Sequence, residues 1–222
     1  MRNKSRTKII SWCFYDFGNS AFTTLVVTFI YATYFTKAIA PDEITGTLLW
    51  SRGISISAIL IAFLSPILGA IADQTGLRRR MLIFTTLISV VTTFLLFFPT
   101  EGMIREVLIL FVIGNVSYEL GSVFYNSYLP EIAPPEKVGR ISGYGWGFGY
   151  VGGLIIMFIA MVGFVNAEIP WFGLDRNGEH IRATNILVAA WFAVFSLPLI
   201  LTIREAPRKK KGNFGKVVKD SF

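Results

Sequence analysis

Six apolar segments, each roughly 18 to 26 residues long, constrain the fold of this chain more than any other feature of its sequence. They cover residues 10–34, 50–72, 81–98, 106–129, 141–165 and 184–203. A helix needs roughly 20 apolar residues to cross the hydrocarbon core of a bilayer. Because backbone groups in lipid must bond within the protein, each segment is expected to be a helix. The sequence therefore predicts an all-α membrane protein, built as a six-transmembrane-helix bundle.

Composition supports this interpretation and divides the chain along its length. Of the 222 residues, 53% are hydrophobic and only 16% are charged, whereas a soluble globular domain has about 25% charged residues. We expect a cytoplasmic head at residues 1–9, a six-helix transmembrane domain at residues 10–203, and a basic cytoplasmic tail or inter-half linker at residues 204–222. The lipid bilayer is therefore the first predicted partner of this chain.

The positive charges are distributed so that they orient the bundle in the membrane. Of 21 Lys and Arg residues, 16 lie in the head, in the loops after the second and fourth spans, and in the tail, while five lie on the other side. Because cytoplasmic segments carry an excess of Lys and Arg, we expect both termini to be cytoplasmic. This pattern accounts for the net charge of +7, so we expect no nucleic-acid partner.

Two acids lie within the apolar spans away from their ends, each within a polar stripe at helical spacing. The first stripe consists of Asp16, Asn19, Ser20 and Thr23, and the second consists of Asn115, Glu119, Ser122 and Asn126. A charged group at the bilayer centre costs about 2.5–3.5 kcal/mol on insertion scales, so both stripes are expected to face one aqueous cleft. We predict a substrate or ion pathway formed by Asp16, Asn19, Asn115, Tyr118, Glu119, Tyr125 and Asn126.

The two acids leave different alternatives open. Asp16 lies near one membrane surface, where it could instead be an interface residue that pairs with Lys8 or Arg140. Glu119 lies near the middle of its span, so a peripheral role suits it less well. A carboxylate at that depth suits either a coupling proton or the cationic group of a small-molecule solute. Glu119 is our predicted site for the proton or cation.

The short loop between the second and third spans has the spacing G-xxx-D-xx-G-x-R-R. The residues that form this pattern are Gly69, Asp73, Gly76, Arg78, Arg79 and Arg80. Glycine at position 76 permits a tight reversal of the chain, and the arginines hold the start of the third helix at the cytoplasmic surface. Charge bias alone would explain a basic loop, whereas the complete spacing is much more specific.

Glycines alternate with aromatic residues at the start of the fifth span, over residues 143–153. On a helix, Gly145, Gly149 and Gly153 form a strip of small residues one turn apart. Such strips let another helix approach closely, so we predict a role in helix packing. The functional alternative is a sliding or rocking surface during gating.

Motifs for catalysis or cofactor binding are missing from the sequence. It contains one His and one Cys, and it has no nucleotide-binding loop, zinc-ligand spacing or Ser–His–Asp set. We therefore expect neither a metal nor another cofactor, and we expect the protein not to be an enzyme.

Four segments together resemble the amino-terminal half of a major facilitator superfamily transporter. They read YDFGNSAF, LSPILGAIADQTGLRRR, VFYNSYLPEI and GRISGYGWGFGYVGG. Gln74 is a departure, because the family usually has a basic residue there. The branch that the chain resembles contains autophagy-related vacuolar amino-acid effluxers and their bacterial relatives. The resemblance implies alternating access, amino acids or similar small solutes as substrates, and a location in a bacterial plasma membrane.

The same resemblance implies that this chain is equivalent to one half of the fold. Such transporters have two six-helix halves, each with a 3+3 inverted repeat, and the substrate binds between them. We then expect a second six-helix half, or another copy, against which Asp73, Arg78, Arg79 and Arg80 close a cytoplasmic gate. The leading hypothesis is half of a secondary active transporter coupled to an ion or proton. The alternative is a truncated remnant or a membrane interaction subunit that does not transport.

Overall fold

Helices form nearly all of the structure. The computed structural model describes residues 2–203, with side chains from residue 6 onward, so the predicted tail at residues 204–222 lies outside the described residues. The α-helices are α1 (Arg2–Ala21), α2 (Tyr31–Tyr34), α3 (Glu43–Thr75), α4 (Arg78–Leu95), α5 (Ile104–Asn126), α6 (Leu129–Ile132), α7 (Val138–Ala160) and α8 (Glu179–Thr202). The π-helical segments are η1 (Phe22–Phe29), η2 (Phe35–Ile39) and η4 (Met161–Val165), and the 3-10 turns are η3 (Pro135–Lys137) and η5 (Trp171–Gly173). Residues 2–203 contain no β-strand.

Five helical stretches are long and apolar enough to cross a membrane. Within the described residues they cover Arg6–Ile39, Glu43–Thr75, Ile104–Ile132, Pro135–Val165 and Glu179–Thr202. The prediction of an all-helical membrane protein is therefore confirmed. The remaining predicted span, residues 81–98, falls on α4, whose 18 residues begin with three arginines and leave a shorter apolar stretch. The count of six spans stays a prediction.

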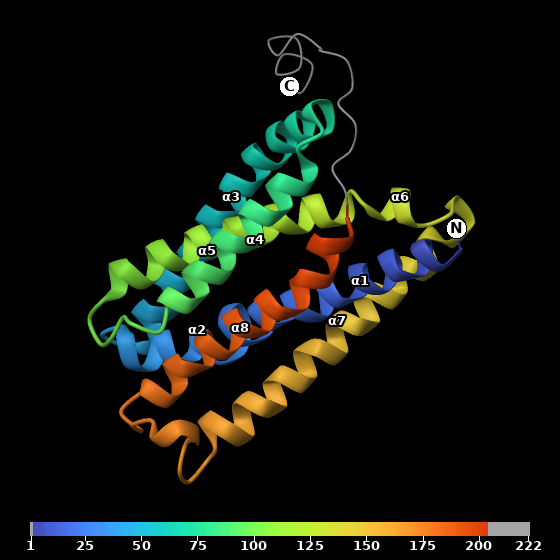
Figure 1. Cartoon of the computed structure of the whole chain (residues 1–222). Helices are drawn as coiled ribbons and strands as arrows, with labels where there is room; N and C mark the ends of the chain where they lie inside the picture. Colours follow the sequence, from blue (N-terminus) through green and yellow to red (C-terminus); the bar gives the residue numbers. More distant parts are fainter. Residues whose placement is uncertain (1, 204–222) are drawn as a thin grey trace.

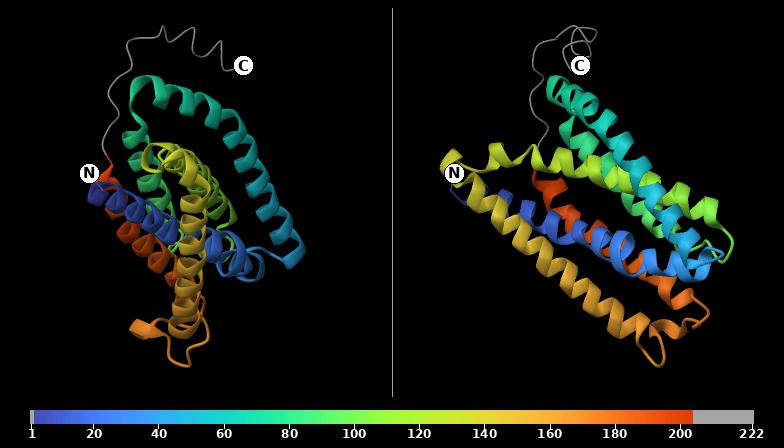
Figure 2. Two further views of the ribbon diagram at one scale, coloured as in Figure 1. Left: turned by 90° about the vertical axis from the view of Figure 1, so that its right-hand side faces the viewer. Right: turned by 180° about the vertical axis from the view of Figure 1, so that it is seen from behind.

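The long helices are arranged in two groups that lie side by side (Figure 1). One group consists of α1, α7 and α8, the other consists of α3, α4 and α5, and α4 joins the groups by packing against α8. In Figure 1 and in the right-hand view of Figure 2, α3 and α7 lie on opposite sides of the bundle. Only 6% of the apolar stretch of α3 is buried, against 39% for the stretch that contains α7, so α3 is the less enclosed of the two.

Large aromatic side chains connect the two groups. The ring of Tyr125 on α5 stacks on those of Trp12 and Tyr15 on α1, with centroids 4.5 and 4.8 Å apart. The Trp12 indole donates to the Tyr125 carbonyl oxygen at 3.2 Å, and the Tyr15 hydroxyl lies 2.8 Å from that of Thr86 on α4. Each ring pair contributes about 0.5–1.5 kcal/mol beyond its burial. This aromatic stack holds α1 to α4 and α5.

The first span widens into π-helix twice along its second half. The amide of Ile30 bonds to the carbonyl of Leu25 at 3.0 Å, and that of Ala40 bonds to Phe35 at 2.9 Å. Both are bonds between residues five apart, where an α-helix would bond residues four apart. The segment η4 widens the end of α7 in the same way. Such turns occur often at functional sites, and here η1 and η4 extend the two helices that border the cavity described below.

Both ends of α3 are defined by residues with specific backbone roles. Asp42 caps the start of the helix by accepting a hydrogen bond from the amide of Thr45 at 2.9 Å. The same bond lowers the pKa of Asp42 below its usual value. Gly76 ends the helix in the left-handed conformation, with φ of 73°. Residues with a side chain rarely adopt this φ, so Gly76 provides the tight reversal that the sequence predicts.

The start of α1 and the end of α8 lie at the same end of the bundle. The hydroxyl oxygens of Ser11 in α1 and Thr202 in α8 are 3.2 Å apart. Further along the pair, the indole of Trp191 donates to the carbonyl of Phe17 at 3.2 Å. The first and last helices therefore run side by side, and the described chain returns to the side on which it begins.

Candidate functional site

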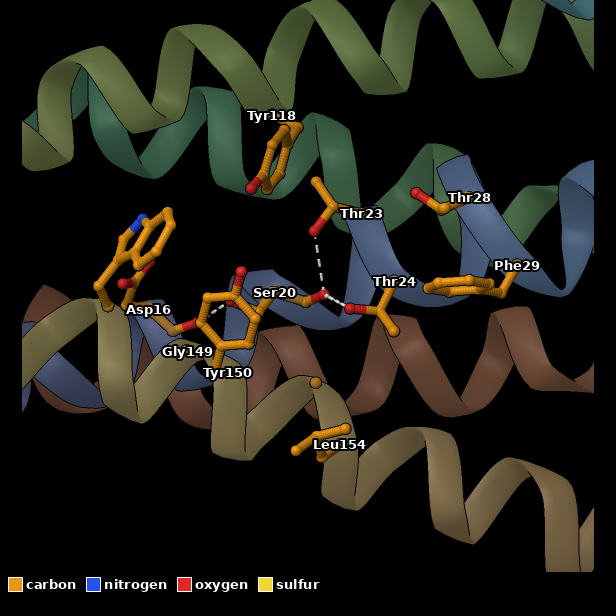
Figure 3. A pocket seen from close by; sticks show the side chains of 12 residues that line it. Asp16, Ser20, Thr23, Thr24, Thr28, Phe29, Tyr118, Gly149, Tyr150 and Leu154 are labelled. Carbon is orange, nitrogen blue, oxygen red and sulfur yellow. Dashed lines mark hydrogen bonds between the residues drawn. The ribbon is translucent and has the colours of Figure 1, made fainter.

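A cavity of about 500 Å³ lies between α1 with its extension η1, α5 and α7. The residues that line it are Asp16, Ser20, Thr23, Thr24, Thr28, Phe29, Tyr118, Trp146, Gly149, Tyr150, Gly153 and Leu154. Figure 3 shows the polar side chains of α1 and η1 along one wall and the side chains of α7 along another. The side chains of Trp146, Tyr150 and Leu154 are exposed, so the cavity is open along α7.

The polar wall is a row of hydroxyls that bond to their own helix. Ser20 Oγ donates to the carbonyl of Asp16 at 2.8 Å, and Thr23 and Thr24 donate to the carbonyl of Ser20 at 3.1 and 2.7 Å (Figure 3). This bonding within the helix satisfies the hydroxyl protons of Ser20 and Thr24, while the Thr23 hydroxyl also interacts with that of Tyr118 on α5. It also fixes the three hydroxyl oxygens in the wall of the cavity.

Asp16 is the one acid among the lining residues, and its side chain is half-buried. The ion pairs found within residues 6–203 involve none of Asp16, Lys8 and Arg140. The interface pairing considered for Asp16 is therefore not found in the described structure. A partly desolvated carboxylate without a cation nearby is unfavourable, so this wall favours a positively charged occupant.

The π-helical turn decides which residues of the first span reach the cavity. Thr23 and Thr28 are five residues apart, as are Thr24 and Phe29, and all four line the cavity. In an α-helix, residues five apart differ by about 140° around the axis and do not share a face. The wider turn of η1 brings them together. Thr24 and Thr28 continue the spacing of four residues from Asp16 and Ser20, so the sequence pattern could have indicated them, whereas Phe29 joins this wall only through the wider turn.

Two aromatic residues of α7 were also missed. Trp146 and Tyr150 lie one turn apart, with ring centroids 5.1 Å from each other, and both line the cavity. Their spacing of four residues in a glycine-rich segment was a usable signal, because it puts two aromatic rings on one face of a helix. Only their contact with the polar wall of α1 could not be foreseen.

The predicted glycine strip lies where α7 packs against α1. A Cβ atom added to Gly145, Gly149 or Gly153 would lie under 3.0 Å from a side chain of α1 or of its extension η1. At Gly152 it would lie 2.2 Å from the carbonyl oxygen of Phe17, which is backbone and cannot turn aside. The glycines thus allow the two helices to approach closely. Two of them also form part of the cavity wall.

Two of the seven residues predicted for a pathway, Asp16 and Tyr118, line the cavity. Glu119 follows Tyr118 on α5 and is half-buried, but it is not among the lining residues. The acid that the structure places in the cavity is therefore Asp16, and the role of Glu119 stays a prediction.

The other four predicted pathway residues take different positions. Asn19 and Asn115 are buried between helices, with exposed fractions of 3% and 8%. Tyr125 belongs to the aromatic stack, and Asn126 is exposed at the end of α5. The stripe on each helix is therefore spread over more than one environment. A direct role of these four residues in transport stays a prediction.

The charged loop after α3 is tied to its own half of the molecule. Arg78 forms an ion pair with Glu131 in α6 and lies 3.5 Å from Asp73. Arg79 donates to the carbonyl of Ile200 in α8 at 3.1 Å. Both arginines thus have partners within the described residues, and a gate contact with a second half would add to these bonds.

The remaining residues of the loop pattern are Gly69, Gly76 and Arg80. Gly76 provides the reversal described above. A Cβ atom added to Gly69 would have no neighbour within 4 Å, so close packing does not explain that glycine. Arg80 is exposed at the start of α4.

Comparison with known families identifies the chain. The model of the family described as vacuole effluxer Atg22-like matches residues 49–222, which is most of the sequence. The chain belongs to this family. The resemblance found in its sequence motifs is therefore confirmed, and this Atg22-like chain is classed with transporters, as the sequence predicts.

Curated relatives of the Atg22-like chain come from bacteria and yeast. The MFS-type transporter YxiO of Bacillus subtilis is 28% identical over 205 residues, which cover 90% of this chain and 47% of YxiO. A protein of Aquifex aeolicus is 31% identical over 162 residues, covering 71% of this chain and 39% of the relative. Autophagy-related protein 22 of Kluyveromyces lactis is 20% identical over 170 residues, covering 72% and 33%. The chain thus spans about half the length of these relatives or less.

Solved structures show the fold of the Atg22-like chain. The proton:xylose symporter XylE bound to 6-bromo-6-deoxy-D-glucose matches with a TM-score of 0.71 at 15% identity, over 99% of this chain and 50% of that chain. The xylose transporter XylE from E. coli in an inward-open conformation matches with a TM-score of 0.62 at 16% identity, over 97% and 51%. The Atg22-like chain therefore has the fold of about half a major facilitator superfamily protein, and it is an integral, multi-pass membrane protein.

Proposed function

We propose that this Atg22-like chain is half of a secondary active transporter that moves a small solute, an amino acid or similar compound, by alternating access. The observation that carries the proposal is the cavity between α1, α5 and α7, where Asp16 has no cationic partner within the described residues. An unpaired acid inside a membrane protein is costly and usually belongs to a substrate or ion pathway. The exposed side of this cavity along α7 is open to a second half.

The partner that this proposal requires is a second six-helix half or another copy of the chain. The proposal includes six spans arranged as a 3+3 inverted repeat, in which substrate binds between two halves. The match to 50% of the proton:xylose symporter supports it. Native mass spectrometry of the purified protein tests this part, because a second polypeptide or a homodimer is expected and a strict monomer would contradict it.

The coupling and the orientation are proposed from charge. We assign the solute to Asp16 and the coupling proton or cation to Glu119, which is half-buried next to the cavity residue Tyr118. The excess of Lys and Arg, with 16 of 21 on one side, supports cytoplasmic termini in a bacterial plasma membrane. Cysteine accessibility at the exposed Glu136 and Asp175, labelled from each side of the membrane, tests the orientation.

The transport test compares two neutral substitutions in proteoliposomes that contain the full chain. Asp16→Asn is expected to lower uptake of radiolabelled amino acids at least tenfold, which corresponds to about 1.4 kcal/mol or more. Glu119→Gln is expected to abolish uptake driven by a pH or sodium gradient while it preserves exchange of solute at equilibrium. Exchange needs the solute site and gating but no net movement of the coupling ion.

The matched control is Glu136→Gln, which neutralises an exposed acid in η3 outside the cavity. Its uptake is expected to equal that of the wild-type protein. If gradient-driven uptake were unchanged in both Asp16→Asn and Glu119→Gln, the roles assigned to these acids would be wrong. If the wild-type chain, reconstituted together with the partner that native mass spectrometry identifies, showed neither uptake nor exchange, the non-transporting alternative would replace the proposal.

A further inference from the structure

The hydrogen bonds of the polar wall determine what kind of group it can bind. A hydroxyl has one proton and two lone pairs. Ser20, Thr23 and Thr24 each donate that proton to a backbone carbonyl of their own helix, at 2.8, 3.1 and 2.7 Å. Ser20 and Thr24 therefore present lone pairs to the cavity, whereas the Thr23 hydroxyl also interacts with that of Tyr118, which lines the cavity as well. Figure 3 shows the three hydroxyls in a row beside Asp16.

The charge of the wall also favours a ligand group that donates hydrogen bonds and is positively charged. An ionised Asp16 only accepts hydrogen bonds, and the cavity lining contains no Lys, Arg or His. The carboxylate lies close to the helix opposite, because a Cβ atom at Gly149 would be 3.1 Å from Asp16 Oδ2 and 2.7 Å from Ser20 Oγ. One compact region thus combines a negative charge with several acceptors. A group with several donors, a positive charge and no acceptors is its complement.

The rest of the lining fits an organic substituent. Trp146 and Tyr150 lie against each other at 5.1 Å on the open side, and aromatic faces attract cations. Phe29 and Leu154 add apolar surface further along the cavity. A volume of about 500 Å³ is also far larger than one water or one inorganic cation requires, since a water occupies about 30 Å³.

We propose that this half recognises the protonated amino group of its solute and does not recognise a carboxylate, so that its ligand class is primary amines, with amino acids as one subset. The proposal rests on the proposed function, because it concerns the same cavity. An ammonium group has three N–H donors and one positive charge, which match Asp16 and the lone pairs of Ser20 and Thr24. A solute carboxylate would meet no cation in this lining and would be repelled by Asp16.

Ligand binding to the full chain in detergent tests this inference separately from transport. Four probes share one apolar side chain and differ in charged groups: L-leucine, L-leucinol, N-acetyl-L-leucine and 4-methylpentanoate. A ligand that binds only the folded protein raises its Tm. Leucinol is expected to raise Tm by at least about 2 °C. Leucine at the same concentration is expected to raise Tm by a smaller amount, because its carboxylate is repelled by Asp16. The two probes without an amino group are expected to leave it unchanged.

The same Tm measurement on two variants and in two salts completes the test. Asp16→Asn is expected to remove the shift given by both amines, and Glu136→Gln is expected to retain it. A shift from N-acetyl-L-leucine equal to that from leucine, or no shift from leucinol, would overturn the inference. Replacing KCl with NaCl separates this cavity from the cation site proposed at Glu119. A sodium shift as large as the leucinol shift that Asp16→Asn removes would overturn the inference by indicating a bare cation site at Asp16, whereas a sodium shift that Asp16→Asn retains would leave it supported. Binding of amines without uptake would contradict the proposed function and leave amine recognition supported.

Discussion

Two helix pairs in this molecule, α1–α7 and α4–α5, pack through the same kind of contact, but only the first contact borders the cavity that contains Asp16. Where α7 meets α1, Gly149 lies opposite the hydroxyl of Ser20, and where α5 meets α4, Gly114 lies opposite the hydroxyl of Thr92. In both pairs the hydroxyl bonds to a carbonyl of its own helix, so the glycine contacts a satisfied group. The α4–α5 contact is buried on both sides, whereas the α1–α7 contact opens into a cavity with an unpaired acid.

The comparison shows that a glycine opposite a hydroxyl determines how closely two helices approach each other. Such a contact does not by itself create a binding site. On α4, five hydroxyl side chains are buried, and they are Thr85, Thr86, Ser89, Thr92 and Thr93. None of them lines the cavity. The α1 wall differs in two respects, namely the presence of Asp16 and the widening of η1, which brings Phe29 into the same wall. Charge and a local change of helix type therefore distinguish the site from the packing.

The largest effect on stability is expected within α7 itself, where two glycines provide a matched pair. A Cβ atom at Gly152 would lie 2.2 Å from the Phe17 carbonyl oxygen, whereas at Gly147 it would meet nothing within 4 Å. Gly152→Ala should therefore push α7 away from α1 and destabilise the protein by about 1–3 kcal/mol. Gly147→Ala should leave stability equal or slightly higher, since alanine is the better helix former.

Thermal unfolding of both variants in detergent checks this prediction. The Tm of Gly152→Ala should fall by several degrees, given about 2–4 °C per kcal/mol at this chain length. The Tm of Gly147→Ala should stay at or above the wild-type value. Equal Tm values for the two variants would show that α7 does not pack on α1 as described.

A smaller change in stability is expected for the glycine–hydroxyl contact in each helix pair, and double-mutant cycles measure it. Gly114→Ala places a Cβ 2.7 Å from Thr92 Oγ1, and Gly149→Ala places one 2.7 Å from Ser20 Oγ. Adding Thr92→Ala to the first variant and Ser20→Ala to the second should restore part of the lost stability. The coupling energy should be about 0.5–3 kcal/mol in each cycle, because each pair is in direct contact.

The two double variants should differ in uptake of solute, although both should recover stability. The Gly114→Ala, Thr92→Ala variant should regain uptake together with its Tm. The Gly149→Ala, Ser20→Ala variant should regain Tm only, because the added Cβ still lies 3.1 Å from Asp16 Oδ2 and one acceptor is gone. Parallel recovery of uptake in both double variants would contradict the placement of the solute beside Gly149.

Much of the fold was predictable because bilayer thickness and backbone bonding leave few options. The apolar segments could only be helices, and the strip of Gly145, Gly149 and Gly153 favoured close approach of another helix. The site was less predictable. Periodicity gives the angle of a residue around its helix but not the helix that lies opposite. Asn19 and Asp16 share a stripe in the sequence, yet the first is buried and the second faces the cavity.

Two further features could not be read from sequence for physical reasons. The π-helical turn of η1 depends on how the first span packs, and it changes which residues share a face. Tyr125 looks like a polar flank of the fourth span, but stacking on Trp12 draws it into the core. Arg78 and Arg79 were expected to need a second half, whereas carbonyl and carboxylate oxygens of their own half are within reach.

The smallest expected effect compares one substitution on each helix pair. Thr24 donates to Ser20 O at 2.7 Å and Thr92 donates to Ile88 O at 2.8 Å, so replacing either by valine removes the same internal bond at nearly constant shape. Both variants should change stability by less than about 1.5 kcal/mol. Thr24→Val should also raise the KM for uptake roughly tenfold, which is the lower end of the effect of one lost hydrogen bond to a charged group. Thr92→Val should leave KM unchanged, and a KM shift there of equal size would mean that the α4–α5 contact belongs to the solute pathway after all.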